Sequence, residues 1–286
     1  MINDRACSVA GVSVGVGRPL YWIMGPCVLE TLDGALVIAR HLSELSTRMN
    51  IPVMFKASFD KANRTSGRSF RGPGLKDGLA MLAEIRKQTG LPVTTDVHEC
   101  YQAEAAGSVV NMIQIPAFLA RQTDLVLTAA KSGVPVNIKK GQFMAPWDMR
   151  NVVAKVREVE NGGILLTERG SSFGYNTLVS DMRAIPWMQD LGVPVIFDAT
   201  HSVQMPGGGG DKTSGDRRMV PVLAASAVAA GCDGLFLETH PHPESSPSDG
   251  PNMVPMDRLE DLIRCCLAIR HATETNPVPL LTGSSR

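Results

Sequence analysis

Eight short apolar runs recur along the chain, and they constrain its fold more than any other feature. They are YWIM at 21–24, PVMF at 52–55, PVTT at 92–95, MIQI at 112–115, PVNI at 135–138, ILLT at 164–167, PVIF at 194–197 and GLFL at 234–237. Each run is nearly continuously apolar, which is typical of a parallel strand buried on both faces. Four runs begin with proline, which is tolerated at the first residue of a strand.

Helical periodicity fills segments between these runs, with apolar residues every three to four positions. The clearest of these segments are 74–89, 120–131, 149–159, 217–230 and 256–271. Glycine, which commonly follows a helix end, stands before the next run at positions 90, 133, 192 and 231. This alternation, without a linker, favours a closed (β/α)8 TIM barrel over an open doubly wound sheet. We therefore expect residues 1–286 to form a single barrel domain.

The two ends of the chain depart from this alternation. Residues 7–18 alternate apolar and small residues around glycines, which predicts a β-hairpin within an N-terminal segment 1–18 that covers the bottom of the barrel. The stretch from about 275 to 286 contains Pro and Ser and is typical of a disordered tail.

The composition indicates which kinds of binding partner and which cellular compartment to expect. The chain has 28 Lys and Arg residues and 28 Asp and Glu residues, so it has no net positive charge that would attract nucleic acid or a membrane surface. No apolar run approaches the roughly 18–20 residues of a transmembrane helix, and the N-terminus lacks the plan of a signal peptide. The six cysteines show no disulfide framework, which indicates reduced thiols and a cytoplasmic protein.

Polar or ionisable residues follow the apolar runs. They include Cys27, Lys56, Asp96, His98, Gln114, Lys139, Lys140, Glu168, Arg169, Asp198, His201, Glu238 and His240. The active site of a TIM barrel lies at the carboxyl ends of its strands. We therefore expect these side chains to share one rim.

One group within this set is cationic. It consists of Lys56, Lys61, Arg64, Lys139 and Arg169, with Arg121 as a further candidate. Guanidinium and ammonium groups suit phosphates and carboxylates, although any one of them alone would be read as an ordinary surface charge. Two phosphate dianions at a separation on the order of 10 Å repel by roughly 6–7 kcal/mol at an effective dielectric constant near 20. Several cations at one rim would therefore suit two anionic substrates.

A second group could bind a metal ion. Cys27, His201 and Glu238 follow the first, seventh and eighth runs, which become neighbours when a barrel closes, and Asp249 follows Glu238. One thiol, one imidazole and two carboxylates suit a borderline cation such as zinc, iron or manganese better than magnesium. Spacing alone favours a buried, inert Cys27 over a ligand.

Two further motifs are better explained without a specific binding function. The stretch PGGGGDKTSGDRR at 206–218 is not a Walker A motif, because Asp211 stands where that motif requires glycine. We interpret it as a mobile lid. His240 and His242 are more typical of loop histidines than of metal ligands.

Longer segments resemble the family of 3-deoxy-D-manno-octulosonate 8-phosphate synthases. Residues 56–66, KASFDKANRTS, are similar to that family's KxSFDKANRSS signature. The likeness continues from about residue 20 to 270 through RGPGL at 71–75, TDVHE at 95–99, IQIPAFLARQTDL at 113–125, KKGQF at 139–143, ERGSSFGYNTLVSDM at 168–182, FDATHSVQ at 197–204 and ETHPHPESSPSDGPNM at 238–253. The related enzymes that use erythrose 4-phosphate typically have KPRT in place of KANR.

The resemblance implies a transferase that condenses phosphoenolpyruvate with D-arabinose 5-phosphate in the synthesis of a lipopolysaccharide precursor. By position, Lys61, Lys139 and Arg169 would hold phosphoenolpyruvate, with Lys56, Ser58 and Gln114 nearby. The aldose phosphate would meet Asn63, Arg64 and Thr65, where Thr65 replaces the more usual serine. His201, Asp96 and Lys61 are the expected catalytic residues. Arg121 would reach the site of a neighbouring subunit, which implies a homotetramer.

The family divides at the position of Cys27. Its metal-dependent branch has cysteine in the GPC segment, and its metal-independent branch has asparagine there. This resemblance makes Cys27, His201, Glu238 and Asp249 the expected ligands of a divalent ion, with zinc, iron, manganese, cobalt and cadmium as candidates. The rival functions are condensation with erythrose 4-phosphate, a class II aldolase-like lyase, and a non-catalytic phosphosugar-binding barrel.

Overall fold

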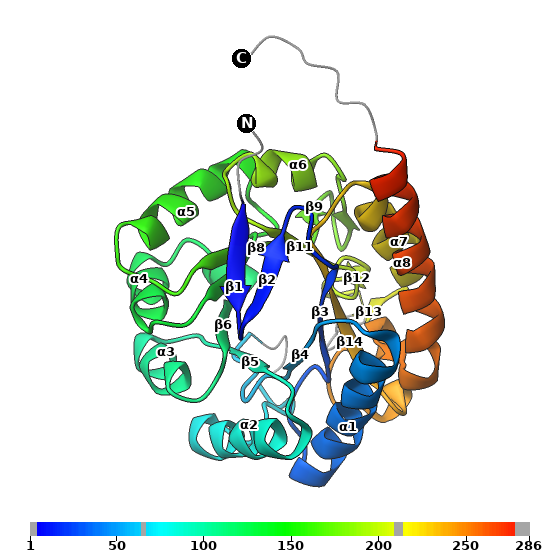
Figure 1. Cartoon of the computed structure of the whole chain (residues 1–286). Helices are drawn as coiled ribbons and strands as arrows, with labels where there is room; N and C mark the ends of the chain where they lie inside the picture. The colour runs from blue at the N-terminus through cyan, green and yellow to red at the C-terminus, as the bar shows by residue number, and fades with distance from the viewer. Residues whose placement is uncertain (1–4, 64–66, 209–213, 278–286) are drawn as a thin grey trace.

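Eight parallel strands form a closed barrel in the computed structural model, which describes residues 5–63, 67–208 and 214–277 (Figure 1). The strands are β3 (Tyr21–Gly25), β4 (Val53–Lys56), β5 (Val93–Asp96), β6 (Met112–Ile115), β7 (Val136–Lys139), β8 (Ile164–Glu168), β11 (Val195–Asp198) and β14 (Gly234–His240). β14 pairs in parallel with both β3 and β11, which closes the ring. The predicted (β/α)8 barrel is confirmed, and each of the eight apolar runs lies at one of these strands.

In the part of the chain that the structure describes, eight α-helices surround the barrel (Figure 1). They are α1 (Leu32–Met49), α2 (Leu75–Thr89), α3 (Cys100–Gly107), α4 (Thr123–Lys131), α5 (Met149–Arg157), α6 (Ala184–Gln189), α7 (Val220–Ala229) and α8 (Leu259–Thr275). Local signals fix their ends: the Thr31 side chain accepts a hydrogen bond from the backbone of Gly34, and Gly90 takes the left-handed conformation that ends α2. The main apolar core lies between this ring and the outer face of the barrel.

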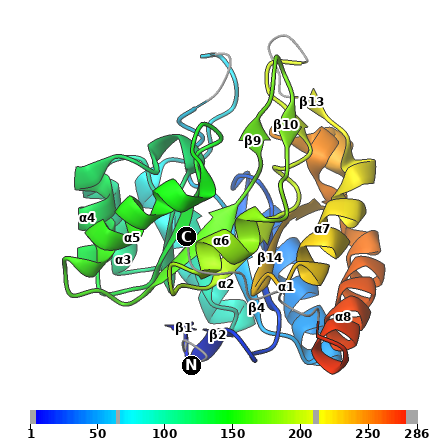
Figure 2. The same cartoon turned by 90° about the horizontal axis from the view of Figure 1, so that it is seen from above.

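A hairpin seals one end of the barrel. Strands β1 (Ala6–Val9) and β2 (Val12–Gly15) pair in antiparallel fashion, as the sequence predicts. Their buried residues Cys7, Val9 and Val14 join a second apolar cluster that fills the barrel. The other members of that cluster are Tyr21, Ile23, Met54, Met112, Leu165, Ile196 and Phe236. Figure 2 shows β1 and β2 at the opposite end from β9 (Ser171–Ser172), β10 (Leu178–Val179) and β13 (Ser214–Gly215).

The barrel interior changes from apolar to polar toward the carboxyl ends of its strands. Met54, Met112 and Phe236 belong to the inner apolar cluster, and the residues two positions later are Lys56, Gln114 and Glu238. Residues two apart on a strand face the same side, so these polar side chains also point inward. The site therefore stands on a packed apolar floor.

Several short elements complete the rim. They are β12 (Gln204–Met205), which pairs with β13, β15 (Val254–Pro255), η1 (Ala117–Leu119), η2 (Pro146–Asp148), η3 (Arg217–Met219), η4 (Pro243–Ser245), η5 (Gly250–Asn252) and η6 (Met256–Arg258). The predicted lid at 206–218 falls partly on residues 209–213, and the predicted tail mostly on 278–286, which lie outside the described residues. Within the described parts of the chain, no helix has the length and apolar character needed to cross a bilayer.

Candidate active site

A cavity of about 1020 Å³ opens at the carboxyl rim of the barrel. Its lining includes eight of the predicted site residues: Lys56, Lys61, Asn63, Asp96, Lys139, Arg169, His201 and Asp249. Side chains from opposite sides of the barrel thus reach one space, as the sequence predicts for groups that follow parallel strands.

The ammonium of Lys56 lies at the base of this cavity. It donates to Ser58 Oγ at 3.0 Å and to the carbonyl of Cys27 at 3.2 Å. It also lies 3.3 Å from a carboxylate oxygen of both Asp96 and Glu238. Because Lys56 is fully buried, these partners replace its hydration, and the cation connects the two acidic sides of the site.

Asp96 is held as an anion. Its Oδ1 accepts from Gln114 Nε2 at 2.6 Å, and its Oδ2 accepts from the Ser58 hydroxyl. Burial alone would raise the pKa of Asp96, but the nearby ammonium groups of Lys56 and Lys61 outweigh it and hold that pKa well below its ordinary range.

Lys139, Asp198 and His201 form a second cluster of ionisable side chains. Lys139 Nζ donates to Asp198 Oδ2 at 2.6 Å, and His201 Nδ1 lies 2.7 Å from the same oxygen. Burial would raise the pKa of Asp198, but the neighbouring His201 and Lys139 side chains lower it. Lys139 Nζ also lies 3.8 Å from the centre of the Phe236 ring, a cation–π contact at the barrel floor.

Gln204 connects a cation to an acid. Its Oε1 accepts from Arg169 Nη2 at 2.6 Å, and its Nε2 donates to Asp249 Oδ1 at 2.8 Å. The Nη1 of Arg169 is buried and has no hydrogen-bond partner among the described residues. Arg169 lines the cavity, and a guanidinium nitrogen without a hydrogen-bond partner among the described residues is suited to an anionic ligand.

The remaining predicted binding residues differ in their placement. Lys61 Nζ lies 4.0 Å from Glu238 Oε1, and Asn63 is an exposed residue at the cavity wall. Arg64 and Thr65 lie outside the described residues. Arg121 is exposed beside the start of α4 and is not among the described residues that line this cavity.

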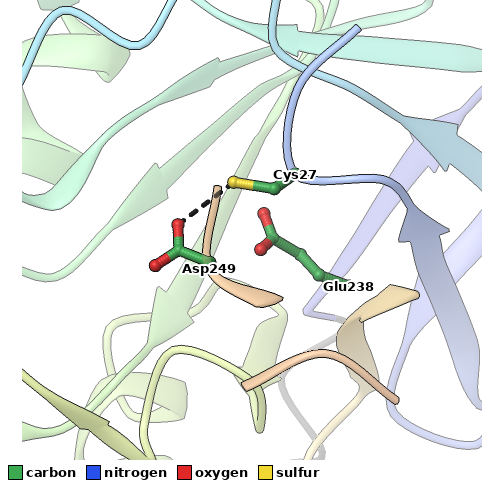
Figure 3. A group of neighbouring side chains, drawn as sticks. All are labelled: Cys27, Glu238 and Asp249. Atoms are coloured by element: carbon green, nitrogen blue, oxygen red, sulfur yellow. Dashed lines mark hydrogen bonds between the residues drawn. The ribbon is translucent and has the colours of Figure 1, made fainter. Parts of the chain in front are cut away.

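Three of the four predicted ligands form a group that could hold a metal ion. One atom from each of Cys27, Glu238 and Asp249 lies within 4.8 Å of the others, and Figure 3 shows the three side chains pointing toward one another. The Cys27 thiol lies 3.1 Å from Asp249 Oδ2 and 2.9 Å from Ser248 Oγ. The fourth, His201, is adjacent, with Nε2 at 3.6 Å from Glu238 Oε1.

The donor atoms fit a divalent cation of borderline softness, as the sequence predicts. Glu238 Oε2 is buried and has no hydrogen-bond partner within the described part of the chain, so it can serve as a ligand atom. Burial, together with Glu238, raises the pKa of the Cys27 thiol well above its ordinary value. A bound cation would reverse this, because metal coordination stabilises the thiolate.

Several residues at the site are not predicted from the sequence as site residues. The sequence indicates Asp198 only as a polar residue at a strand end, and it does not point to Gln204, Ser248, Asn137 or Thr167. A signal existed for Asn137, since it stands two positions before Lys139 on β7 and therefore faces inward. No local pattern identifies Gln204, because its two partners lie 35 and 45 residues away.

Comparison with known proteins agrees with this geometry. A family model described as "DAHP synthetase I family" matches residues 3–273. The chain belongs to the DAHP synthetase I family.

Within that family, the chain is similar to proteins named 2-dehydro-3-deoxyphosphooctonate aldolase. The relative from Nitrobacter winogradskyi is 58% identical over 262 residues, covering 91% of both chains. The relative from Bradyrhizobium diazoefficiens is 55% identical over 271 residues, or 94% of this chain and 96% of the relative. That from Acidithiobacillus ferrooxidans is 51% identical over 271 residues, or 95% and 96%.

Proposed function

We propose that this protein is a transferase that condenses phosphoenolpyruvate with D-arabinose 5-phosphate and water. The products are 3-deoxy-D-manno-octulosonate 8-phosphate, a precursor of the lipopolysaccharide inner core, and inorganic phosphate. The observation that carries the proposal is the identity of 51–58%, over at least 91% of the chain, with the three relatives named 2-dehydro-3-deoxyphosphooctonate aldolase. The KANR segment at 61–64 further supports a five-carbon aldose.

The cationic side chains have a direct role in this proposal. Lys61, Lys139 and Arg169 bind phosphoenolpyruvate, and such a contact is supported by Arg169 Nη1, which has no hydrogen-bond partner among the residues that the structure describes. Lys56, Ser58 and Gln114 lie behind them and hold the site in shape. Asn63, together with Arg64 and Thr65, binds the aldose phosphate. Fixed cations offset the repulsion between the two anionic substrates and bring their reacting carbons together.

Bond formation joins the enol carbon of phosphoenolpyruvate to the aldehyde carbon of the sugar. Water adds at C2 of the former phosphoenolpyruvate unit, and phosphate then leaves with its bridging oxygen. Asp96, an anion between Lys56 and Gln114, accepts hydrogen bonds from the aldose hydroxyls. His201 is oriented by Asp198 at its Nδ1, which leaves Nε2 to face the reacting groups. Lys61 stabilises negative charge that develops during the reaction.

Cys27, Glu238 and Asp249, with His201, would hold a divalent metal ion such as zinc, iron, manganese, cobalt or cadmium. The proximity of the first three side chains supports this assignment, as does Glu238 Oε2, which has no hydrogen-bond partner in the described part of the chain. When bound, such an ion supplies Lewis acidity to a coordinated oxygen.

The assembly and location belong to the same proposal. Arg121 is exposed and is not among the described residues that line this chain's own cavity, which supports a homotetramer in which Arg121 completes a neighbouring site. Residues 1–286 act as a single barrel domain in the cytoplasm, a location consistent with six free cysteines.

The decisive assay compares two aldoses. Phosphate release and loss of phosphoenolpyruvate are measured with arabinose 5-phosphate, with erythrose 4-phosphate and with no aldose. We expect rapid release only with arabinose 5-phosphate, at one phosphate per phosphoenolpyruvate consumed. Faster turnover of erythrose 4-phosphate would contradict the proposal and support the rival condensation with that sugar. No release with either sugar would favour a binding protein or a lyase.

A further inference from the structure

A hydrogen-bonded row of buried polar side chains runs behind the cavity, across β5, β6, β7 and β8. Gln114 Nε2 donates to Asp96 Oδ1 at 2.6 Å, and Asn137 Nδ2 donates to Gln114 Oε1 at 3.0 Å. Thr167 Oγ1 donates to Asn137 Oδ1 at 2.7 Å. Asn137 and Thr167 are fully buried and are not among the described residues that line the cavity.

The strand register produces this row. Asp96 is the direct neighbour of Gln114 across the β5–β6 pair, and Gln114 is the direct neighbour of Asn137 across β6–β7. Asn137 lies opposite Leu165, so Thr167, two residues further along β8, is its diagonal neighbour on the same inner face. The row is thus a consequence of the register of these four neighbouring strands.

The hydrogen bonds in the row all point the same way. An ionised Asp96 only accepts, so Gln114 must present its amide nitrogen and leave its oxygen facing Asn137. Asn137 must then donate to that oxygen and leave its own oxygen facing Thr167. The Thr167 hydroxyl supplies the last donor, and each amide in the row is held in a single orientation.

Simple filling of space does not account for these residue types. The layer beneath consists of apolar residues such as Leu165 and Ile196, which pack without any polar partner. A buried amide destabilises the folded protein unless each of its polar atoms has a hydrogen-bond partner. Two amides and a hydroxyl are therefore costly residue types at positions where only apolar packing is needed.

We propose that Asn137 and Thr167 are positioning residues that, through Gln114, fix the Asp96 carboxylate against Lys56 and Ser58. This inference rests on the proposed function, in which Asp96 receives the aldose. Neither residue touches the substrate. They act by keeping Oδ2 of Asp96 directed at Ser58 and Lys56 while Oδ1 is occupied by Gln114.

The test uses variants of Thr167 that separate hydrogen bonding from shape. Thr167→Val keeps the branched shape and removes the hydroxyl, whereas Thr167→Ser keeps the hydroxyl and removes the methyl group. We expect Thr167→Val to lower kcat/KM for arabinose 5-phosphate by about 10-fold, the effect of one lost hydrogen bond near 1.4 kcal/mol. The KM for phosphoenolpyruvate should stay within about twofold, and Thr167→Ser should retain activity within about twofold of wild type.

A second pair keeps the test independent of folding defects. If Thr167→Val does not fold, Thr167→Ala and Thr167→Ser make the same comparison, because they differ only by the hydroxyl. The inference is overturned if the variants without the hydroxyl match Thr167→Ser, or if the KM values of both substrates rise together while kcat falls. Wild-type protein that releases no phosphate in the same assay would instead overturn the proposed function, and this inference with it.

Discussion

The thiol of Cys27 lies 3.1 Å from the carboxylate of Asp249, although 222 residues separate them in the sequence. Cys27 follows the first barrel strand, and Asp249 lies in the loop after the last, so closure of β14 on β3 creates the contact. A buried thiol beside two carboxylates is unfavourable as a thiolate without a cation, because burial and Glu238 both raise its pKa. The arrangement is therefore suited to an occupied metal site.

Replacement of Cys27 tests this assignment directly. Loss of even a supporting contact around a metal commonly lowers affinity about 10–100-fold, so Cys27→Ser should weaken zinc binding by at least about 100-fold. Competition with a coloured chelator measures the affinity. Cys265→Ser is the matched control, because Cys265 is an exposed thiol outside the site and its loss should leave the affinity unchanged. Equal affinity in the two variants would remove Cys27 from the ligand set.

The asparagine variant tests the branch assignment. Cys27→Asn introduces the residue of the metal-independent branch, and we expect it to retain condensation activity after chelation. A Cys27→Asn protein whose activity still requires added metal would count against the assignment.

Gln204 should couple anion binding to the metal site. Gln204→Leu removes the hydrogen bonds to both Arg169 and Asp249, leaving the buried Arg169 and the half-buried Asp249 with fewer partners. We expect the KM for phosphoenolpyruvate to rise by about 10-fold, equivalent to about 1.4 kcal/mol, with weaker metal binding. Gln88→Leu, an exposed substitution on α2, is the control for steady-state kinetics. An unchanged KM together with unchanged metal affinity would show that the bridge has no functional part.

The buried ion pair of Lys140 and Glu168 should be important for folding. Lys140 lies 3.6 Å from Glu168 and donates to the carbonyls of Gly141 and Met144, with no exposure to solvent. Removing one member of a buried pair typically costs about 3–5 kcal/mol, so Lys140→Met should lower the free energy of unfolding by that amount in urea titrations. The exposed pair Lys87–Glu84 gives the control, since Lys87→Met should change stability by less than about 1 kcal/mol.

A double variant separates the charge from the packing. Lys140→Met combined with Glu168→Gln no longer leaves a buried carboxylate unpaired, and it should be less destabilised than Lys140→Met alone. Additive losses in the double variant would mean that the two side chains act independently.

Cys7 should make stability decline at alkaline pH. Burial raises the pKa of its thiol from 9.0 to about 11 in the folded state. The folded state therefore retains this proton longer than the unfolded state, so its stabilisation is complete below about pH 9 and is lost as the pH rises through about 11. The maximum contribution for such a shift is about 2–3 kcal/mol.

Comparison of two thiol variants isolates that contribution. Between pH 8 and pH 11, the free energy of unfolding should fall less in Cys7→Ala than in wild type, while the exposed control Cys265→Ala should follow wild type. Identical pH slopes in Cys7→Ala and wild type would contradict the assignment.

The barrel could be predicted because its signals are local. Each strand is a short apolar run, and its length and flanking proline or glycine are visible without knowledge of distant residues. Helix α6 gave a weaker signal, since Ala184–Gln189 is only six residues long and contains Pro186, too little for helical periodicity. The rim location of the site followed from the fold class.

The partners within the site could not be predicted in the same way. Lys139 and Lys140 are adjacent cations in the sequence, but strand alternation sends Lys139 into the cavity and Lys140 to the Glu168 pair. Whether Asp198 pairs with Lys139, 59 residues away, depends on the stagger of the closed barrel and on side-chain rotamers. Neither the stagger of the barrel nor the side-chain rotamers can be read from short-range sequence patterns.

Metal-dependent condensation is the centre of this account, and removal of the metal tests it most directly. Protein treated with a strong chelator, freed of it and verified as metal-free should lose phosphate release from phosphoenolpyruvate and arabinose 5-phosphate. Activity should return on addition of about one equivalent of a divalent ion such as zinc, manganese or cobalt. Metal-free wild-type protein that retains full activity would contradict the account.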